Sequence, residues 1–191
     1  MDYKKREKAV RARIKEEEFE TDEEGRVVVR INITDGDYLL SVYNDDGMKI
    51  ISAETAKFID DVTKPIPAKQ DIHLKISCDD YTTDKEQEYK NAITNYYTNE
   101  FAYWDIKLKH NLQLALVLFL VSCVCFTLLY FMSTWHTHEI LYLLFEVASW
   151  VFAWEAVDIF FLQRFQMNYN KHKAMQIIYA RISFRRLKDM N

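Results

Sequence analysis

Glycine and proline are scarce in this chain of 191 residues, which contains three glycines and two prolines. None of them lies in residues 68–191. Because these two residues most often interrupt helices, their absence predicts long uninterrupted helices in that part of the chain. The shortage of glycine also argues against a glycine-rich phosphate loop and hence against a nucleotide-hydrolysing enzyme.

Lysine and arginine are missing from two apolar runs, residues 112–132 and 140–163. A helix that crosses a bilayer needs about 20 mostly apolar residues, and both runs are long enough. The charged N-terminus lacks the apolar region of a secretory signal. The sequence therefore predicts a multi-pass membrane protein whose first span is also its targeting signal.

Residues that could support catalysis or metal binding are few. The chain has three cysteines, none of which we expect in a disulfide. His136, His138 and Glu139 form a short turn without a fourth ligand nearby, which favours a solvated loop over a metal site. We find no Ser/His/Asp arrangement with a plausible nucleophile. We therefore predict no enzyme activity, no catalytic residues, no cofactor and no metal.

The basic residues predict the orientation of the spans. Lys107 and Lys109 precede the first span and Arg164 follows the second, whereas the connecting residues 133–139 contain no Lys or Arg. Positive residues flank the cytoplasmic ends of spans. Both termini are therefore expected in the cytoplasm.

Three acids interrupt the second run: Glu146, Glu155 and Asp158. A carboxylate at membrane depth costs about 2.5 to 3.5 kcal/mol unless it is paired, protonated or hydrated. Two spans shield three acids poorly, so we expect a homo-oligomer, with a tetramer favoured. At about 100° per residue Glu146 lies opposite Glu155, which predicts that the acids serve at least two surfaces.

Each acid has two open interpretations. It forms an interhelical hydrogen bond or ion pair, with Lys109 and His110 as candidate partners, or it belongs to a pore or gate. Trp150, Trp154 and Ser149 are candidates for the same roles. Ser149 lies with Ala153 and Ala156 on a small-residue face that another helix can approach closely.

The polar portion of the chain predicts a small α+β domain, a small sheet with helices. Residues 26–33 and 37–43 are expected to form a β-hairpin. Ser52 is expected to cap a helix that ends before Pro65, and residues 71–78 alternate as a third strand. One long helix is expected from about residue 84 to 132, so that it continues from the domain into the first span.

The predicted organisation has four parts. Residues 1–24 form a charged segment, 25–110 a cytoplasmic α+β domain with its connecting helix, 111–163 a transmembrane helical hairpin, and 164–191 a basic cytoplasmic tail whose residues 176–184 could return a strand to the sheet. Residues 1–110 contain 18 Lys and Arg against 24 Asp and Glu, whereas the tail contains 7 basic residues and one acid.

Basic clusters at both ends are candidates for binding a polyanion or an anionic membrane surface. For the first cluster, at residues 4–20, a solvated or disordered segment is the simpler interpretation. The candidate residues are Lys4, Lys5, Arg6, Arg11, Arg13, Arg181, Arg185 and Arg186.

Several segments resemble a group of small bacterial two-span membrane proteins. They include ISAETAKFIDD, DIHLKISCDD and, most specifically, the motif Trp150-x3-Trp154-Glu155-x2-Asp158. The architecture is similar to that of membrane effectors in bacterial anti-phage operons, such as the channel of the Hailong system. This resemblance implies an ion channel in the bacterial cytoplasmic (inner) membrane, gated by a nucleotide-derived or single-stranded DNA ligand that a partner enzyme makes.

The sequence thus leaves two functions open. The first is an oligomeric ligand-gated ion channel or membrane-permeabilising effector in anti-phage defence. The second is a membrane-anchored sensor or scaffold subunit without conduction. Intramembrane acids distinguish them, because a simple anchor needs none.

Overall fold

The computed structural model describes residue 4 and residues 19–33, 36–44, 47–78, 83–134 and 139–186. The chain forms two compact units: unit 1 comprises residues 1–97 and 175–191, and unit 2 comprises residues 98–174. The described part is mostly helical, with a small parallel sheet in unit 1 and two long apolar helices. Most of the basic cluster at residues 4–20 lies outside the described residues, as does the turn at 135–138.

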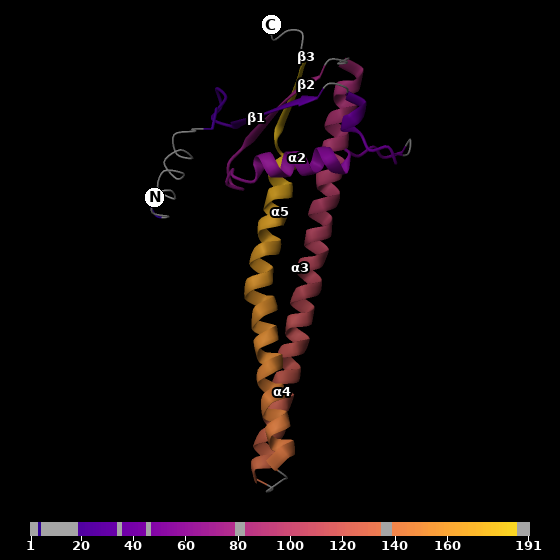
Figure 1. The fold of residues 1–191 in the computed structure, drawn as a ribbon. Coiled ribbons are helices and arrows are strands. Elements are labelled where there is room, and N and C mark those ends of the chain that lie inside the picture. The colour runs from indigo at the N-terminus through magenta and orange to yellow at the C-terminus, as the bar shows by residue number, and fades with distance from the viewer. Residues whose placement is uncertain are drawn as a thin grey trace. The chain divides into compact units, whose positions relative to one another are not determined.

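Unit 1 is built around a three-stranded sheet in the order β1-β2-β3, comprising β1 (Val27–Ile33), β2 (Ile72–Cys78) and β3 (Arg181–Arg186) (Figure 1). Both pairs are parallel. Parallel neighbours need a crossover, and α2 (Ala53–Thr63) provides it between β1 and β2. The C-terminal tail does return a strand to the sheet, but β3 begins at Arg181, since residues 176–178 still belong to a helix.

Helix α2 begins and ends where the sequence predicts. The Ser52 hydroxyl accepts a hydrogen bond from the Thr55 amide at 3.2 Å, which satisfies one of the free donors of the first turn. The helix ends at Thr63, before Pro65. Its buried face joins the core of unit 1, whose least exposed residues include Ala56, Ile59, Leu74, Ile76, Tyr89 and Ile93.

The predicted β-hairpin is wrong. Residues Gly36–Leu39 form a short 3-10 helix, η1, instead of a strand. The free edge of β1 is instead contacted by the segment that precedes the strand. The Val28 amide donates a hydrogen bond to the Glu20 carbonyl at 2.7 Å. Gly36 also packs so closely on Tyr89 that a β-carbon there would overlap the Tyr89 hydroxyl. Close packing therefore determines the path of this segment. Its apolar sequence pattern does not determine the path, because Val42 and Tyr43 are both exposed.

The predicted long helix is confirmed: α3 comprises the 52 residues Thr83–Thr134, in unit 1 up to Tyr97 and in unit 2 from Thr98. It continues slightly beyond the predicted end at residue 132. The second apolar run forms α4 (Glu139–Asp158), a π-helical segment η2 (Ile159–Gln163) and then α5 (Arg164–Ile178).

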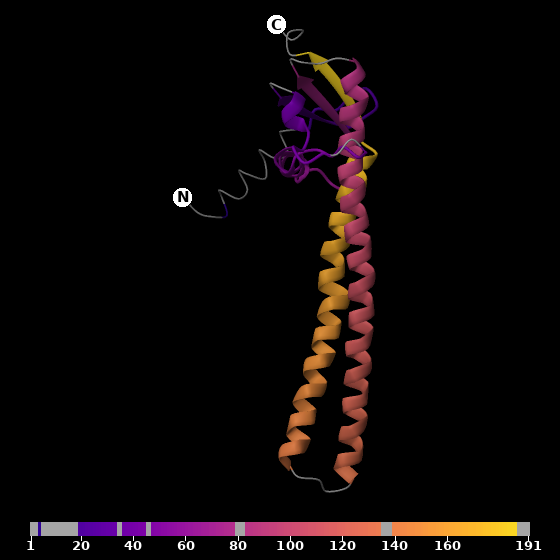
Figure 2. The same cartoon turned by 90° about the vertical axis from the view of Figure 1, so that its right-hand side faces the viewer.

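Within unit 2, α3 runs antiparallel to α4 and α5 (Figure 2). Ser122 contacts Ser149, and Asn111 contacts Gln163. The residue numbers of the paired positions therefore rise along one helix and fall along the other, as in an antiparallel pair. The rings of Phe126 and Trp150 meet edge to face, with centroids 5.7 Å apart. Such aromatic pairs favour close packing.

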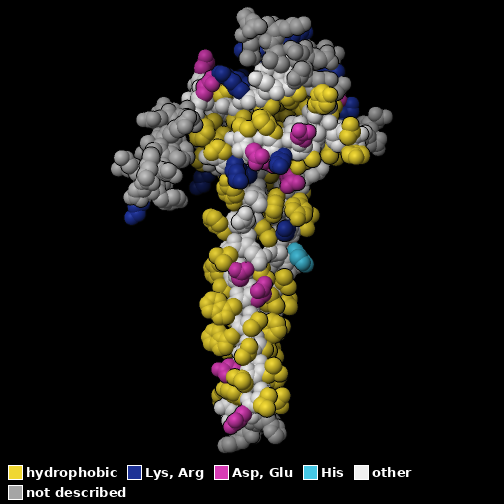
Figure 3. Space-filling model, viewed as in Figure 1, with side chains coloured by type: hydrophobic (Ala, Val, Ile, Leu, Met, Phe, Trp, Pro, Cys, Tyr) yellow, Lys and Arg dark blue, Asp and Glu magenta, His cyan; other side chains and the backbone are white. Residues whose placement is uncertain are grey.

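Two helices are long and apolar enough to cross a membrane, as judged from length and composition. A core helix of a soluble protein would satisfy the same test but would be mostly buried. In these two helices only 17% and 11% of the most apolar window is buried within the chain. Their apolar side chains therefore face outward, as Figure 3 shows for one side of the molecule.

Candidate functional site

Helix α4 has two distinct faces, of which the first packs on α3. Ser149 is fully buried there and Ala156 is 5% exposed. The Ser122 hydroxyl donates a hydrogen bond to the Ser149 carbonyl at 3.0 Å, and the Ser149 hydroxyl donates to the Phe145 carbonyl at 2.6 Å. The small-residue face expected from the sequence is thus a contact within one chain.

Beside this contact, α4 has an open groove of about 780 Å³, lined by α4 residues alone. Trp150 in its lining also meets Phe126 of α3. All three acids border it, together with both tryptophans of the Trp-x3-Trp motif. The lining residues are Leu143, Glu146, Val147, Trp150, Val151, Trp154, Glu155 and Asp158.

The expectation that the acids serve at least two surfaces stays a prediction. The groove covers about half of the helix circumference, so Glu146 and Glu155 lie at its two borders and the tryptophans lie between them. Glu155 is exposed, and Glu146 and Asp158 are half-buried. Figure 3 shows acidic side chains among the apolar ones on this part of the molecule.

Asp158 ends α4 and anchors a short polar network. The Gln163 side-chain amide donates to the Asp158 carboxylate at 3.1 Å, and its carbonyl accepts from the Asn111 amide at 3.1 Å. In an α-helix, residues five positions apart point about 140° away from each other. The π-helical segment η2 lies between these two residues, and its i→i+5 repeat brings them to one side. The sequence contained no Gly or Pro that would have predicted this irregularity.

Lys109 and His110 have different positions from those expected. Lys109 pairs with Asp105 on its own helix at 2.7 Å, and Lys171 of α5 binds the other oxygen of the same carboxylate at 2.5 Å. His110 is exposed. Within the described residues of a single chain, neither forms an ion pair with the α4 acids.

Hydrogen bonds from Lys109 and then from Lys171 lower the pKa of Asp105 to about 2. Asp105 lies outside the apolar run, and Lys171 also lies 4.8 Å from the centre of the Phe101 ring. This cluster ties α5 to α3 in unit 2.

Changing Asp105 to Asn is expected to lower the thermal unfolding midpoint at neutral pH, because both lysines lose their charged partner. A folded-state pKa below the ordinary value of 3.8 stabilises the folded state above that pH, and the stabilisation disappears between about pH 4 and pH 2. The difference between the two proteins should therefore shrink over that interval in a pH series of thermal melts. A difference that is constant down to pH 2 would contradict this assignment.

Sequence reasoning missed one cluster in unit 1. The ring of His73 contacts the Asp22 carboxylate through Nδ1 at 3.0 Å and the Ser183 hydroxyl through Nε2 at 2.8 Å. Backbone hydrogen bonding from Arg26, with smaller contributions from His73 and Glu24, lowers the pKa of Asp22. His73 is separated from its two partners by 51 and 110 positions in the sequence, so no local motif could reveal the cluster. These residues link the turn before β1 to β2 and β3.

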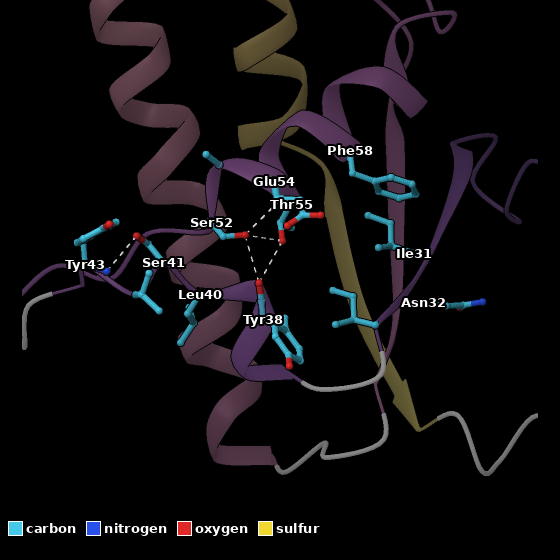
Figure 4. Close-up of a pocket in the computed structure, with 13 residues that line it drawn as sticks. Ile31, Asn32, Tyr38, Leu40, Ser41, Tyr43, Ser52, Glu54, Thr55 and Phe58 are labelled. Atoms are coloured by element: carbon cyan, nitrogen blue, oxygen red, sulfur yellow. Dashed lines mark hydrogen bonds between the residues drawn. The ribbon is translucent and has the colours of Figure 1, made fainter.

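Unit 1 also contains a pocket of about 720 Å³, shown in Figure 4, at the carboxyl end of β1 and the start of α2. Tyr38, Ser52 and Thr55 are joined there by hydrogen bonds. Phe58 lies above Ile31, and the wall is mostly apolar. Carboxyl ends of parallel strands are common binding positions in α/β sheets.

The candidate polyanion-binding residues are divided among several places. Arg181 and Arg185 project from one face of β3, and Arg186 has the opposite parity along the strand. Lys4 is exposed. The remaining four, Lys5, Arg6, Arg11 and Arg13, lie outside the described residues.

Comparisons with protein-family models, with curated proteins and with solved structures found no match. The resemblance to two-span membrane effectors therefore stays an expectation from the sequence.

Proposed function

We propose that this protein is an oligomeric integral membrane protein that acts as a ligand-gated ion channel or membrane-permeabilising effector. The observation that carries the proposal is the acidic groove of α4. Its three acids line a groove formed by α4 residues alone, and within the described residues of a single chain none of them forms an ion pair. If α4 crosses a bilayer, these acids face lipid in an isolated chain.

Lipid exposure of the acids would be costly. Each carboxylate at membrane depth costs about 2.5 to 3.5 kcal/mol on insertion scales. A second copy placed against the groove of α4 would remove this cost, and a closed ring of copies would do so for every subunit. A tetramer is the arrangement that we favour. Carboxylates at such a contact can pair with a neighbour or line a water-filled path, as in cation-selective pores.

The continuity of α3 supports gating by a ligand. The helix has no Gly or Pro and belongs to unit 1 in its first turns and to unit 2 thereafter. A ligand that shifts the first turns of α3 would therefore act on the apolar helix through an unbroken backbone. A nucleotide-derived or single-stranded DNA ligand, a bacterial inner membrane and a role in anti-phage defence follow from the resemblance and are part of the proposal.

A sensor or scaffold subunit without conduction is the second candidate. The pocket beside α2 favours it, because a ligand site in unit 1 needs no pore. Ion flux from liposomes that contain the purified protein separates the two functions. A channel releases trapped ions above the level of protein-free liposomes, at least in the presence of its ligand or in a constitutively open variant, whereas a sensor releases none under any condition.

Both termini are expected in the cytoplasm, with the turn near His136 outside, because basic residues flank only the other ends of the apolar runs. Epitope tags at residues 1 and 191 should resist protease added to spheroplasts, whose outer membrane is permeable, and a tag inserted near His136 should be cleaved. Lysed spheroplasts provide the control in which all three tags are cleaved. Digestion of the N-terminal tag in intact spheroplasts would overturn this topology.

A further inference from the structure

The two faces of the sheet in unit 1 have opposite chemistry. Residues alternate between faces along each strand, and the parallel register aligns them across strands. One face is apolar and includes Val29, Leu74, Ile76 and Phe184, and the Phe184 ring lies 5.8 Å from Tyr89 of α3. The other face, here called the polar face, has three rows of three positions: Val28, His73 and Arg181; Arg30, Lys75 and Ser183; Asn32, Ser77 and Arg185.

The polar face is unusual for a parallel sheet. Parallel sheets are normally covered by helices on both faces and are apolar on both. Here eight of the nine positions are polar or charged. The side chains at its margins, Arg30, Asn32, Arg181 and Arg185, are exposed. His73 and Ser77 on the central strand are buried, so the exposed margins are the part of this face that is open to water or a polar ligand.

The charge of the polar face is predominantly positive. Two of its cations have acidic partners: Arg30 pairs with Glu20 at 2.5 Å and Arg181 with Glu24 at 2.9 Å. All four of these side chains are more than half exposed, and such pairs contribute only about 0 to 1 kcal/mol. An incoming anion can therefore replace the acids.

Lys75 and Arg185 have no acidic partner among the described residues. Lys75 is the register partner of Ser183 in the middle row, and Arg185 is the partner of Ser77 in the next. Neighbouring strands lie about 4.8 Å apart and alternate residues about 6.7 Å apart along a strand. Two cations without an acidic partner among the described residues thus share one small area of the face.

The His73 cluster holds this area in place. The contact between the His73 ring and Ser183, at 2.8 Å, fixes β3 against β2, and Asp22 at 3.0 Å fixes the ring. The cations therefore project from a fixed framework. Such preorganisation lowers the entropy cost of binding.

We propose that the polar face binds a chain of phosphate groups through charge and hydrogen bonding alone. Arginine and lysine favour phosphate oxygens. Small ligands usually require a concave site, whereas a flat array of cations suits an extended polyanion. None of the nine positions is Phe, Tyr or Trp, and the one imidazole, that of His73, is buried, so the face exposes no aromatic ring on which bases could stack. The ligand is therefore recognised by its backbone, without base preference. This inference concerns unit 1 and holds whether or not the protein conducts ions.

The test measures binding of fluorescent single-stranded oligonucleotides to the full-length protein in neutral detergent. We expect oligonucleotides of different sequence to bind equally and inorganic polyphosphate to compete with them. Changing Lys75 to Ala or Arg185 to Ala should weaken binding about tenfold and lower the slope of log affinity against log salt by roughly 0.7 for each cation. Changing Glu24 to Gln should strengthen binding, because Arg181 is then freed.

Arg186→Ala is the matched control, since it removes the same charge from the same strand on the opposite face. Its affinity should stay within about twofold of the unmodified protein. Equal losses from Arg185→Ala and Arg186→Ala would overturn the proposal, as would a strong preference for one base. Binding to vesicles with anionic lipids but not to oligonucleotides or polyphosphate would overturn it too and assign the face to a membrane surface instead. None of these outcomes depends on ion flux, so they are independent of the channel proposal.

Discussion

Changing Glu155 to Gln or Asp158 to Asn is expected to alter ion flux by about tenfold while the protein stays abundant in the membrane. Both residues border the open groove of α4. If this groove contributes to a conduction path, loss of one carboxylate changes the barrier for a cation, and a change of about 1.4 kcal/mol is a tenfold change in rate. Flux is measured in liposomes that contain matched amounts of the two proteins.

The change of Asp158 to Asn separates charge from structure. The side-chain carbonyl of the introduced asparagine could still accept a hydrogen bond from Gln163, as the Asp158 carboxylate does at 3.1 Å, so the polar network is retained and the charge is lost. Glu139→Gln is the control, because Glu139 is exposed in the first turn of α4 and does not line the groove. Equal flux from the unmodified protein and both variants would remove these two acids from the conduction path. Flux at the level of protein-free liposomes from all three would favour the sensor function.

A structural ion pair predicts a different result. Removing one partner of a buried pair costs about 3 to 5 kcal/mol. Protein abundance and assembly would then fall together with flux. Measuring abundance alongside flux therefore distinguishes the two open interpretations of these acids.

Changing Ser122 to Leu is expected to reduce the amount of folded protein in the membrane severalfold. Ser122 is 2% exposed at the contact with the fully buried Ser149, and its hydroxyl bonds the Ser149 carbonyl. A leucine there removes that hydrogen bond and forces α3 and α4 apart, and overpacking of this kind typically costs about 1 to 3 kcal/mol. Abundance and thermal midpoint are measured in membranes.

Cys123→Leu is the matched control for this contact. Cys123 is the next residue of α3 and is exposed. The leucine there extends an apolar surface and should leave abundance unchanged. If both variants were equally abundant, the α3–α4 contact would not be the one described here.

Elements with a strong local signal could be predicted from the sequence. Ser52 and Pro65 delimit α2, alternation marks β2, and the lack of Gly and Pro predicts the length of α3. The hairpin after β1 could not be rejected locally, because its turn residues and apolar pattern are typical of one. Contacts with residues outside this segment determine its structure: the Glu20 carbonyl accepts a hydrogen bond from the edge of β1, and Tyr89 packs on Gly36.

The residues of the candidate site could be predicted from the sequence, but their arrangement in space could not. The three acids stand out in an apolar run, and the small residues near Ser149 indicate a helix contact. A helical wheel places Glu146 and Glu155 on opposite sides, yet the open groove is wide enough to include both. The hydrogen bond between Asp158 and Gln163 depends on a π-helical segment that no residue type in the sequence predicts.

In the proposed assembly, copies of the chain cover the acidic groove of α4. The most direct measurement is the mass of the protein particle extracted in a native lipid environment, which counts the subunits. We expect a closed homo-oligomer, with four copies favoured. A particle that contains one chain only, under conditions in which both apolar helices are inserted in lipid, would contradict it.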